Sequence, residues 1–213
     1  HEGTTANDVT GVLALVAGVA LIGLAAWIPF RHRGERTTSP VKRWAIRALV
    51  DAARKGKEVT VVVELMARFD EEANLNWAAR LEEVGAHVIY GVVGHKTHAK
   101  MALVVRREES AEGKVLRRYV HLATGNYHPR TARLYTDFGL MTANEELCAD
   151  VNEVFKQLTG LGRASKMKHV WQSPFTLHKR IVAAIRNEAK LAGEGQEGRI
   201  IAKMNALLEP QII

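Results

Sequence analysis

The chain has 213 residues, of which 47% are hydrophobic and 25% are charged, a composition that is ordinary for a folded protein and excludes disorder over the whole chain. Lysine and arginine exceed aspartate and glutamate, which gives a formal net charge of +7. This excess either favours a polyanionic partner (nucleic acid, an anionic membrane or a phosphate polymer) or forms a solvated basic surface. The single cysteine, Cys148, excludes an intramolecular disulfide and fits a reducing compartment.

The first expected element is an apolar segment at residues 9–30 that carries no charged side chain. As a helix it would span the hydrocarbon core of a membrane, which is roughly 30 Å thick. Basic residues follow it, beginning at Arg31, Arg33 and Arg36, and they place its C-terminal side in the cytoplasm. A buried core helix and a secretory signal peptide are the alternatives, but a signal peptide carries its positive charge before the apolar run. We therefore predict a transmembrane helix here.

After this segment, apolar residues at helical spacing alternate with short runs rich in β-branched residues. The expected helices cover residues 45–55, 70–84 and most of 145–189. The expected strands cover residues 59–65, 87–93, 101–105, 118–122 and 199–204, with a polar turn at 108–113 and a flexible break at 193–198. This alternation predicts an α/β sheet with helices packed on it. Few residues remain to pair with the last strand, so we expect the chain to stop at the start of a second domain.

The densest cluster of reactive side chains is the sequence GHKTHAK at residues 94–100. His98 and Lys100 are two positions apart, so on a strand they would point to the same face. A neutral imidazole nitrogen can attack phosphorus, and a nearby ammonium can bind phosphate oxygens and stabilise the developing charge. The pair is typical of a phosphohistidine site, although a surface histidine beside a lysine also produces so short a motif.

A second cluster follows the expected strand that ends at residue 122. Gly125 permits a close approach of the backbone to a ligand, and Asn126 offers an amide donor. Arg133 adds a planar guanidinium suited to phosphate, and Tyr135 can stack on a base or donate to phosphate. The alternative is a polar loop followed by a helix that starts at Pro129.

A third cluster follows the first β-branched strand, where ligands of α/β sheets tend to bind. Arg68 is placed there for an anion, and Asp70, Glu71 and Glu72 are placed for a metal or, more simply, for capping the next helix. The sequence contains neither a P-loop nor a GxGxxG motif. His95 and His98 form an HxxH pair, but no carboxylate or cysteine is spaced to complete a metal site.

These clusters lie in stretches that resemble the polyphosphate kinase family, whose members make inorganic polyphosphate from ATP. The stretches are VTVVVELMARFDEEAN at 59–74, EEVGAHVIYGVVGHKTHAKMALVVRRE at 82–108 and RRYVHLATGNYHPRTARLYTDFGLMTA at 117–143, followed by SPFTL at 173–177 and RIIAKMNALLEPQII at 199–213. They occur in the family's order, and the resemblance extends over residues 46–213.

The resemblance implies roles for individual residues. His98 would be the phosphorylated histidine, with Lys100 and Asn126 matching the lysine and asparagine of the phospholipase D-type pattern. Arg68 would help to hold phosphate or Mg²⁺, and Tyr135 would contact ATP. We expect Arg133 to bind phosphate beside them.

The resemblance also implies the fold and the activity. We expect an α/β, phospholipase D-like mixed sheet flanked by helices and preceded by the transmembrane helix. The expected domains are 1–45, an apolar membrane segment with a basic linker; 46–192, the first catalytic domain; and 193–213, the start of the second. The implied activity is reversible transfer of the γ-phosphoryl group of ATP to inorganic polyphosphate through a phosphohistidine at His98, with Mg²⁺ as cofactor. The implied assembly is a homotetramer, and no nucleic-acid partner is expected.

Two other functions stay open at this point. A non-catalytic, membrane-tethered polyphosphate-binding module would fit the apolar segment and the absence of a second histidine motif before Ile213. A phospholipase D-type hydrolase is disfavoured, because Val105 stands where that pattern has its aspartate. In either case we expect a cytoplasmic domain anchored to the inner face of the membrane through residues 9–30.

Overall fold

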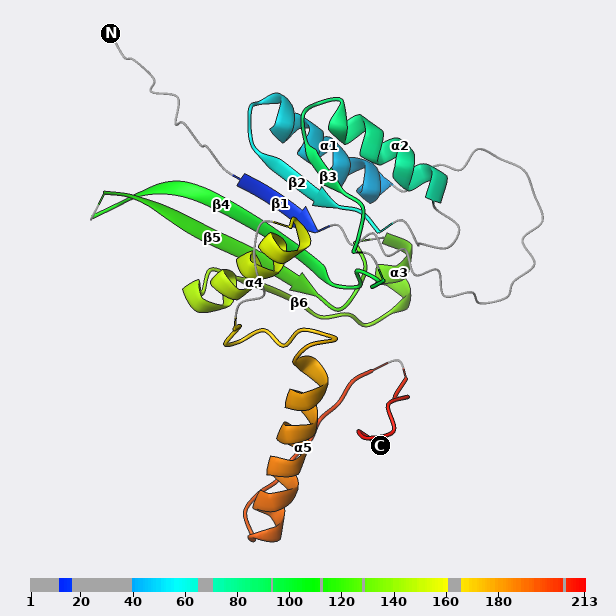
Figure 1. Ribbon diagram of the computed structural model, residues 1–213, viewed down its shortest axis with the longest axis vertical. Coiled ribbons are helices and arrows are strands. Elements are labelled where there is room, and N and C mark those ends of the chain that lie inside the picture. Colours follow the sequence, from blue (N-terminus) through cyan, green and yellow to red (C-terminus); the bar gives the residue numbers. More distant parts are fainter. Residues whose placement is uncertain are drawn as a thin grey trace, which may run out of the picture. The chain divides into compact units, whose positions relative to one another are not determined.

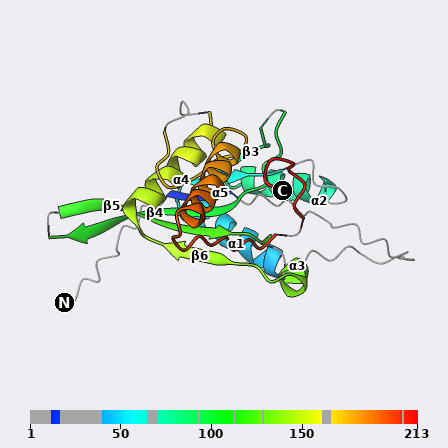
Figure 2. The same ribbon diagram turned by 90° about the horizontal axis from the view of Figure 1, so that it is seen from below.

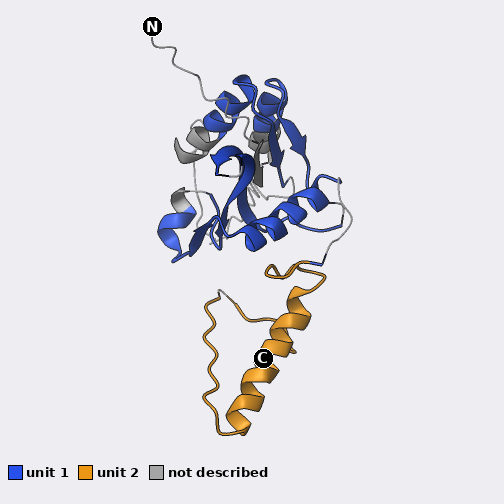
Figure 3. Ribbon diagram, turned by 90° about the vertical axis from the view of Figure 1, so that its left-hand side faces the viewer, with its two compact units in different colours: residues 1–166 blue, residues 167–213 orange. Residues whose placement is uncertain are grey.

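The computed structural model describes residues 12–16, 40–64, 71–92, 94–111, 113–127, 129–160, 166–204 and 206–213, with side chains except at 12–16, 40–45, 71–75 and 129–130. The chain forms two compact units, residues 1–166 and residues 167–213 (Figure 3). The division into domains expected from the sequence, with a boundary after residue 192, stays a prediction.

The first unit is built on a mixed six-stranded sheet with the order β3-β2-β1-β4-β5-β6 (Figure 1). The strands are β1 (Val12–Val16), β2 (Val59–Val62), β3 (His87–Ile89), β4 (Lys100–Ser110), β5 (Gly113–Ala123) and β6 (Gly139–Thr142). Strands β1, β2 and β3 are parallel to one another, whereas β4 is antiparallel to β1, β5 to β4 and β6 to β5.

This pairing brings several chain segments to one edge of the sheet. Strands β1, β2, β3 and β5 all end there, and β4 and β6 both begin there. The register shows the alignment directly, since Lys100 at the start of β4 is paired with Ala123 at the end of β5, which is paired in turn with Gly139 at the start of β6. Loops joined to these strand ends therefore lie next to one another.

Two helices cover one face of the sheet at β2 and β3. They are α1 (Pro40–Arg54) and α2 (Glu71–Glu82). Leu49 and Leu81 from these helices pack with Val59, Val61 and Val63 in one buried cluster. Alternate residues of β2 point to this face, which is why its β-branched residues pack there as a group.

The other face is covered by α4 (Glu145–Leu158), which packs on β4 and β5. The side-chain oxygen of Asn144 accepts a hydrogen bond from the backbone N–H of Leu147 at 3.0 Å and caps the helix. Cys148 is fully buried on this helix, as a small apolar side chain would be. A shorter helix, α3 (Pro129–Leu134), lies between β5 and β6 along the chain.

The second unit contains α5 (Leu177–Gly193) and a C-terminal segment. Within this unit the His178 imidazole lies 3.3 Å from the Glu209 carboxylate, and the Arg180 guanidinium lies 5.9 Å from the centre of the Trp171 ring. None of the side chains of α5 is fully buried.

The prediction of a transmembrane helix is wrong for residues 12–16. They form β1, which is paired on both sides, with β2 and with β4. An apolar run without charge is typical of a central strand as well as of a membrane helix, because both are surrounded by apolar groups. The remainder of 9–30 lies outside the described residues. Among the helices that the structure describes, none is both long enough and apolar enough to cross a membrane.

Other elements differ in extent from the prediction. Residues 108–110 belong to β4 instead of a turn, β3 ends at Ile89, and β6 was not predicted. Residues 166–176 are not helical, so the expected long helical stretch is two separate helices. Residues 199–204 form no strand, because β-structure needs a paired strand and the described residues of the second unit supply none.

Replacing a buried leucine of β4 tests this packing. Leu103 is 2% exposed, whereas Leu116 on β5 is 60% exposed. We expect Leu103→Ala to lower the free energy of unfolding by about 2–5 kcal/mol, because it leaves a cavity. Leu116→Ala should change it by no more than about 0.5 kcal/mol. Urea unfolding of the two variants makes the comparison, and equal losses would contradict the assigned faces of the sheet.

Candidate functional site

The loops at the shared edge bring His98 and Lys100 together. The Nζ atom of Lys100 lies 3.2 Å from Nδ1 and 3.3 Å from Nε2 of His98. The ammonium is thus close to both ring nitrogens. Lys100 is 4% exposed, whereas the His98 side chain is exposed. The two side chains are therefore in contact, with the lysine buried and the histidine at the surface but facing the lysine through its ring nitrogens.

The charges of this pair are set by its surroundings. Partial burial lowers the pKa of His98, and the positive charges of Lys100 and Lys96 lower it further. Burial also lowers the pKa of Lys100 to about 8, with a further lowering by Lys96 and an opposing rise from Asp137. Near neutral pH the imidazole is therefore neutral, with a free electron pair, and the lysine is mainly charged.

Asp137 connects this lysine to the loop after β5. Its carboxylate accepts a hydrogen bond from the hydroxyl of Thr124 at 3.2 Å, and the same hydroxyl oxygen accepts one from the backbone N–H of Phe138 at 2.9 Å. Gly125 fits against the Asp137 carboxyl so closely that a Cβ atom there would overlap it. Glycine at 125 is therefore needed to let the backbone approach the carboxylate.

A second carboxylate holds the loop that carries His98. Glu64, at the end of β2, is 3% exposed, and its Oε2 accepts a hydrogen bond from the backbone N–H of Thr97 at 2.7 Å. Gly91, whose φ is +62°, lies beside the same carboxylate. A buried bond to a charged acceptor is strong, so it fixes the backbone next to His98.

A contact between His121 and Tyr127 joins the loop after β5 to that strand. The hydroxyl of Tyr127 lies 2.7 Å from Nδ1 of His121, which is on β5. Burial raises the pKa of Tyr127 to about 12, so its hydroxyl keeps its proton. Asn126, which precedes this tyrosine, has a buried side-chain oxygen without a hydrogen-bond partner, as does the hydroxyl of Thr97. Both polar atoms are thus buried without a hydrogen-bond partner, which is uncommon in a folded protein.

The remaining predicted site residues are placed as follows. Arg133 is exposed on α3, and Tyr135 follows that helix at 37% exposure. Arg68 lies outside the described residues. Asp137 and Glu64 lie in stretches that resemble the family, but neither was predicted as a site residue, because their contacts join loops that are far apart along the chain.

The described residues do not fit a metal ion held by the protein alone. Among them, no group of three or more histidine, cysteine or carboxylate side chains is arranged to hold a metal. The two carboxylates near His98 already have partners, Glu64 with a backbone N–H and Asp137 with a hydroxyl and the Lys100 charge. Among the described residues, the Lys100 ammonium is the charged group that contacts His98.

The fold and the site together define a mixed α/β domain in which a neutral histidine and a buried lysine meet at the strand ends. The family of the polyphosphate kinase C-terminal domain 1 matches residues 38–164, and that of the polyphosphate kinase C-terminal domain 2 matches residues 170–213. The chain belongs to the polyphosphate kinase family.

Individual relatives agree with this assignment. The chain is 68% identical over 166 residues to a polyphosphate kinase of Paraburkholderia phytofirmans and equally identical to one of Burkholderia cenocepacia. These matches cover 78% of this chain and 24% of each relative, so the chain spans about a quarter of their length. The crystal structure of polyphosphate kinase from Porphyromonas gingivalis is similar at 31% identity with a TM-score of 0.65, over 90% of this chain and 28% of that one.

The contact between Gly125 and Asp137 can be tested by a double-mutant cycle. We expect Gly125→Ala to lower the free energy of unfolding by about 1–3 kcal/mol, because its Cβ needs the space of the carboxyl group. In the Gly125→Ala/Asp137→Ala variant the overlap is removed, so the combined loss should be smaller than the sum of the single losses. Additive losses in urea unfolding would contradict this contact.

The pKa of Lys100 can be measured by NMR titration of ¹³C-labelled lysine side chains, with the signal assigned through Lys100→Arg. We expect a midpoint near 8, and a lower one in Asp137→Asn, because that change removes a negative charge that favours the ammonium. Between this midpoint and the ordinary 10.5, the unfolded chain binds more protons than the folded chain, so the cost that the buried ammonium imposes on folding is lost as the pH rises and the free energy of unfolding increases. A midpoint near 10.5 would show that the lysine is not desolvated.

Proposed function

We propose that this chain carries the phosphoryl-accepting site of a polyphosphate kinase, which transfers the γ-phosphoryl group of ATP to inorganic polyphosphate through a phosphohistidine at His98. The observation that carries the proposal is the contact between a neutral His98 and the Lys100 ammonium. The relatives are named polyphosphate kinases, which supports phosphoryl transfer with polyphosphate as a substrate.

The first half-reaction follows from the charges of the pair. A lone pair on a ring nitrogen of His98 attacks the γ-phosphorus, an N–P bond forms, and the bond to the bridging oxygen breaks so that ADP leaves with its electron pair. Lys100 lies beside the attacking nitrogens, where its charge stabilises the negative oxygens of the transferring group. In the second half-reaction a terminal oxygen of polyphosphate attacks this phosphorus, and the N–P bond breaks to restore the neutral imidazole.

The other predicted residues supply binding. The amide N–H group of Asn126 is a proposed donor to the phosphates of the nucleotide, the exposed guanidinium of Arg133 suits the same phosphates, and Tyr135 offers a ring for stacking. Arg68 stays a proposed phosphate ligand. Because the described residues do not fit a protein-held metal, Mg²⁺ is proposed to arrive as part of the substrate, MgATP, to which it binds through the phosphates.

The finer expectations on fold, place and assembly are also proposals. A phospholipase D-like fold is supported by the mixed sheet, whose strand ends carry the His98–Lys100 pair. A cytoplasmic location is supported by the need for ATP and by the reduced state of the buried Cys148. A homotetramer is proposed by resemblance alone.

Labelling with γ-³²P-ATP and Mg²⁺ tests the phosphohistidine. We expect the purified chain to take up acid-labile, base-stable label, and His98→Ala to lose it. His95→Ala is the matched control, since His95 is an exposed histidine on the same loop and should leave labelling unchanged. Label that persists in His98→Ala, or a folded chain that takes up none, would contradict the proposal.

The rate of labelling should also fall both at low pH and at high pH. Below the lowered pKa of His98 the imidazole is protonated and has no free electron pair, and above about 8 the Lys100 charge is lost. We expect Lys100→Met to slow labelling about 100-fold and to remove the alkaline limb, with Lys96→Met as the matched control. An alkaline limb that is retained in Lys100→Met would assign it to another group.

A further inference from the structure

The β4–β5 hairpin extends beyond the rest of the sheet as a two-stranded ribbon (Figures 1 and 2). The pairing of β4 with β1 ends at Val105, and the pairing of β5 with β6 ends at Val120. Beyond these points residues 106–110 and 113–119 pair only with each other among the described strands. We call residues 106–119 the basic ribbon.

Positive charge is concentrated on the basic ribbon. Its cations are Arg106, Arg107, Lys114, Arg117 and Arg118, against the three carboxylates Glu108, Glu109 and Glu112. The register places Arg106 directly opposite Arg117. Residues opposite each other in an antiparallel pair share one face, and like charges in this arrangement destabilise the pair.

A single carboxylate offsets this repulsion, and only in part. Glu108 lies 3.5 Å from the Arg106 guanidinium, and it also accepts a hydrogen bond from the Tyr119 hydroxyl at 2.8 Å. Arg117 has its guanidinium 5.7 Å from the Tyr119 ring, an attraction that does not neutralise its charge. The Arg106–Arg117 pair therefore keeps a local surplus of positive charge at a solvent-exposed position.

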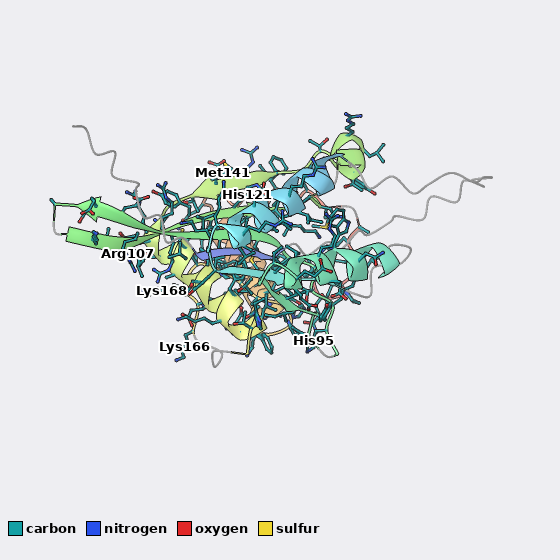
Figure 4. The ribbon with its side chains drawn as sticks, turned by 90° about the horizontal axis from the view of Figure 1, so that it is seen from above. His95, Arg107, His121, Met141, Lys166 and Lys168 are labelled. Carbon is teal, nitrogen blue, oxygen red and sulfur yellow. The ribbon has the colours of Figure 1, made fainter. Side chains whose placement is uncertain are left out.

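The same face of the sheet connects this pair to the candidate site. Side chains alternate along β4, so Lys100 and Arg106 point to one face, at a separation of roughly 20 Å along the strand. His121 and Met141 are paired in register on this face, and Met141 is 84% exposed. Figure 4 shows these two residues on the side of the sheet away from α4, whereas Arg107 lies on the α4 side.

We propose that Arg106 and Arg117 bind inorganic polyphosphate at a distance from its reacting end, which lies at His98 and Lys100. This inference rests on the proposed function. A linear polymer with a negative charge on every unit can follow a sheet face from one cationic position to the next, and guanidinium groups match its phosphate oxygens. A nucleic acid is less well matched, because the aromatic residue of the ribbon, Tyr119, already contacts Glu108 and Arg117 and does not offer a free stacking surface.

Binding of fluorescent long-chain polyphosphate to the purified chain, without ATP, tests the proposal. We expect Arg106→Gln/Arg117→Gln to weaken binding about tenfold and to reduce the slope of log affinity against log salt by about 1. Tripolyphosphate is too short to reach from Lys100 to the Arg106–Arg117 pair. It should therefore bind to Arg106→Gln/Arg117→Gln as tightly as to the unchanged chain. The control variant Arg47→Gln/Lys55→Gln removes the same charge from exposed positions on and next to α1 and should keep full affinity. Arg106→Lys/Arg117→Lys keeps both charges, so the slope of log affinity against log salt should stay that of the unchanged chain.

Three results would overturn the proposal: unchanged binding in Arg106→Gln/Arg117→Gln, an equal loss in the control variant, or single-stranded DNA that competes as well as polyphosphate of equal charge. Circular dichroism checks that each variant is folded. The outcome is separate from that of the labelling test, because a chain that binds the polymer through these arginines without accepting label would contradict the phosphohistidine alone. A chain that accepts label with no effect of the arginines would contradict the basic ribbon alone.

Discussion

The antiparallel pairing of β4 with β5 determines the face of the sheet on which each side chain of these two strands lies. Its register runs from Lys100 opposite Ala123 to Ser110 opposite Gly113. Side chains alternate with a period of two, so a slip of one residue would move Lys100 to the face that α4 covers and would expose Leu103. Leu103 and Val120 are buried, and their burial therefore determines where the lysine points. The apolar core of the domain thus positions a charged group at its edge.

That charged group is held at a cost. A pKa of about 8 in place of 10.5 corresponds to roughly 3 kcal/mol in favour of the neutral amine. Asp137 opposes this shift, and Thr124 and Gly125 hold Asp137 in place. The carboxylate near Lys100 comes from the loop before β6. The lysine stays charged near neutral pH without lying in a strong ion pair, which leaves it able to interact with an anionic substrate.

The sequence predicted those parts of the structure that depend on neighbouring residues. The strand at β2 follows from composition within a few positions, and the closeness of His98 and Lys100 follows from their spacing, although His98 precedes β4 and does not share a strand face with Lys100. Asp137 and Glu64 could not be found in this way, since each contacts the site through a pairing of distant segments. The strand β1 was mistaken for part of a membrane helix because lack of charge indicates apolar surroundings but not their kind. Conversely, residues 199–204 have the composition of a strand and form none, since composition does not supply a strand to pair with.

The two kinds of cation along the β4–β5 hairpin have different chemical properties. The ammonium of Lys100 is a compact charge whose protonation changes with burial, so the fold can adjust it to the chemistry at His98. The guanidinium groups of Arg106 and Arg117 remain charged at any physiological pH and stay at the surface, where a permanent charge attracts a polyanion without a large desolvation cost. An arginine at position 100 could not lose part of its charge, and lysines at 106 and 117 would lack the forked donors that match phosphate. If both proposals hold, the positions of lysine and arginine along this one hairpin separate the group whose charge is adjusted for reaction from the groups that bind the polymer.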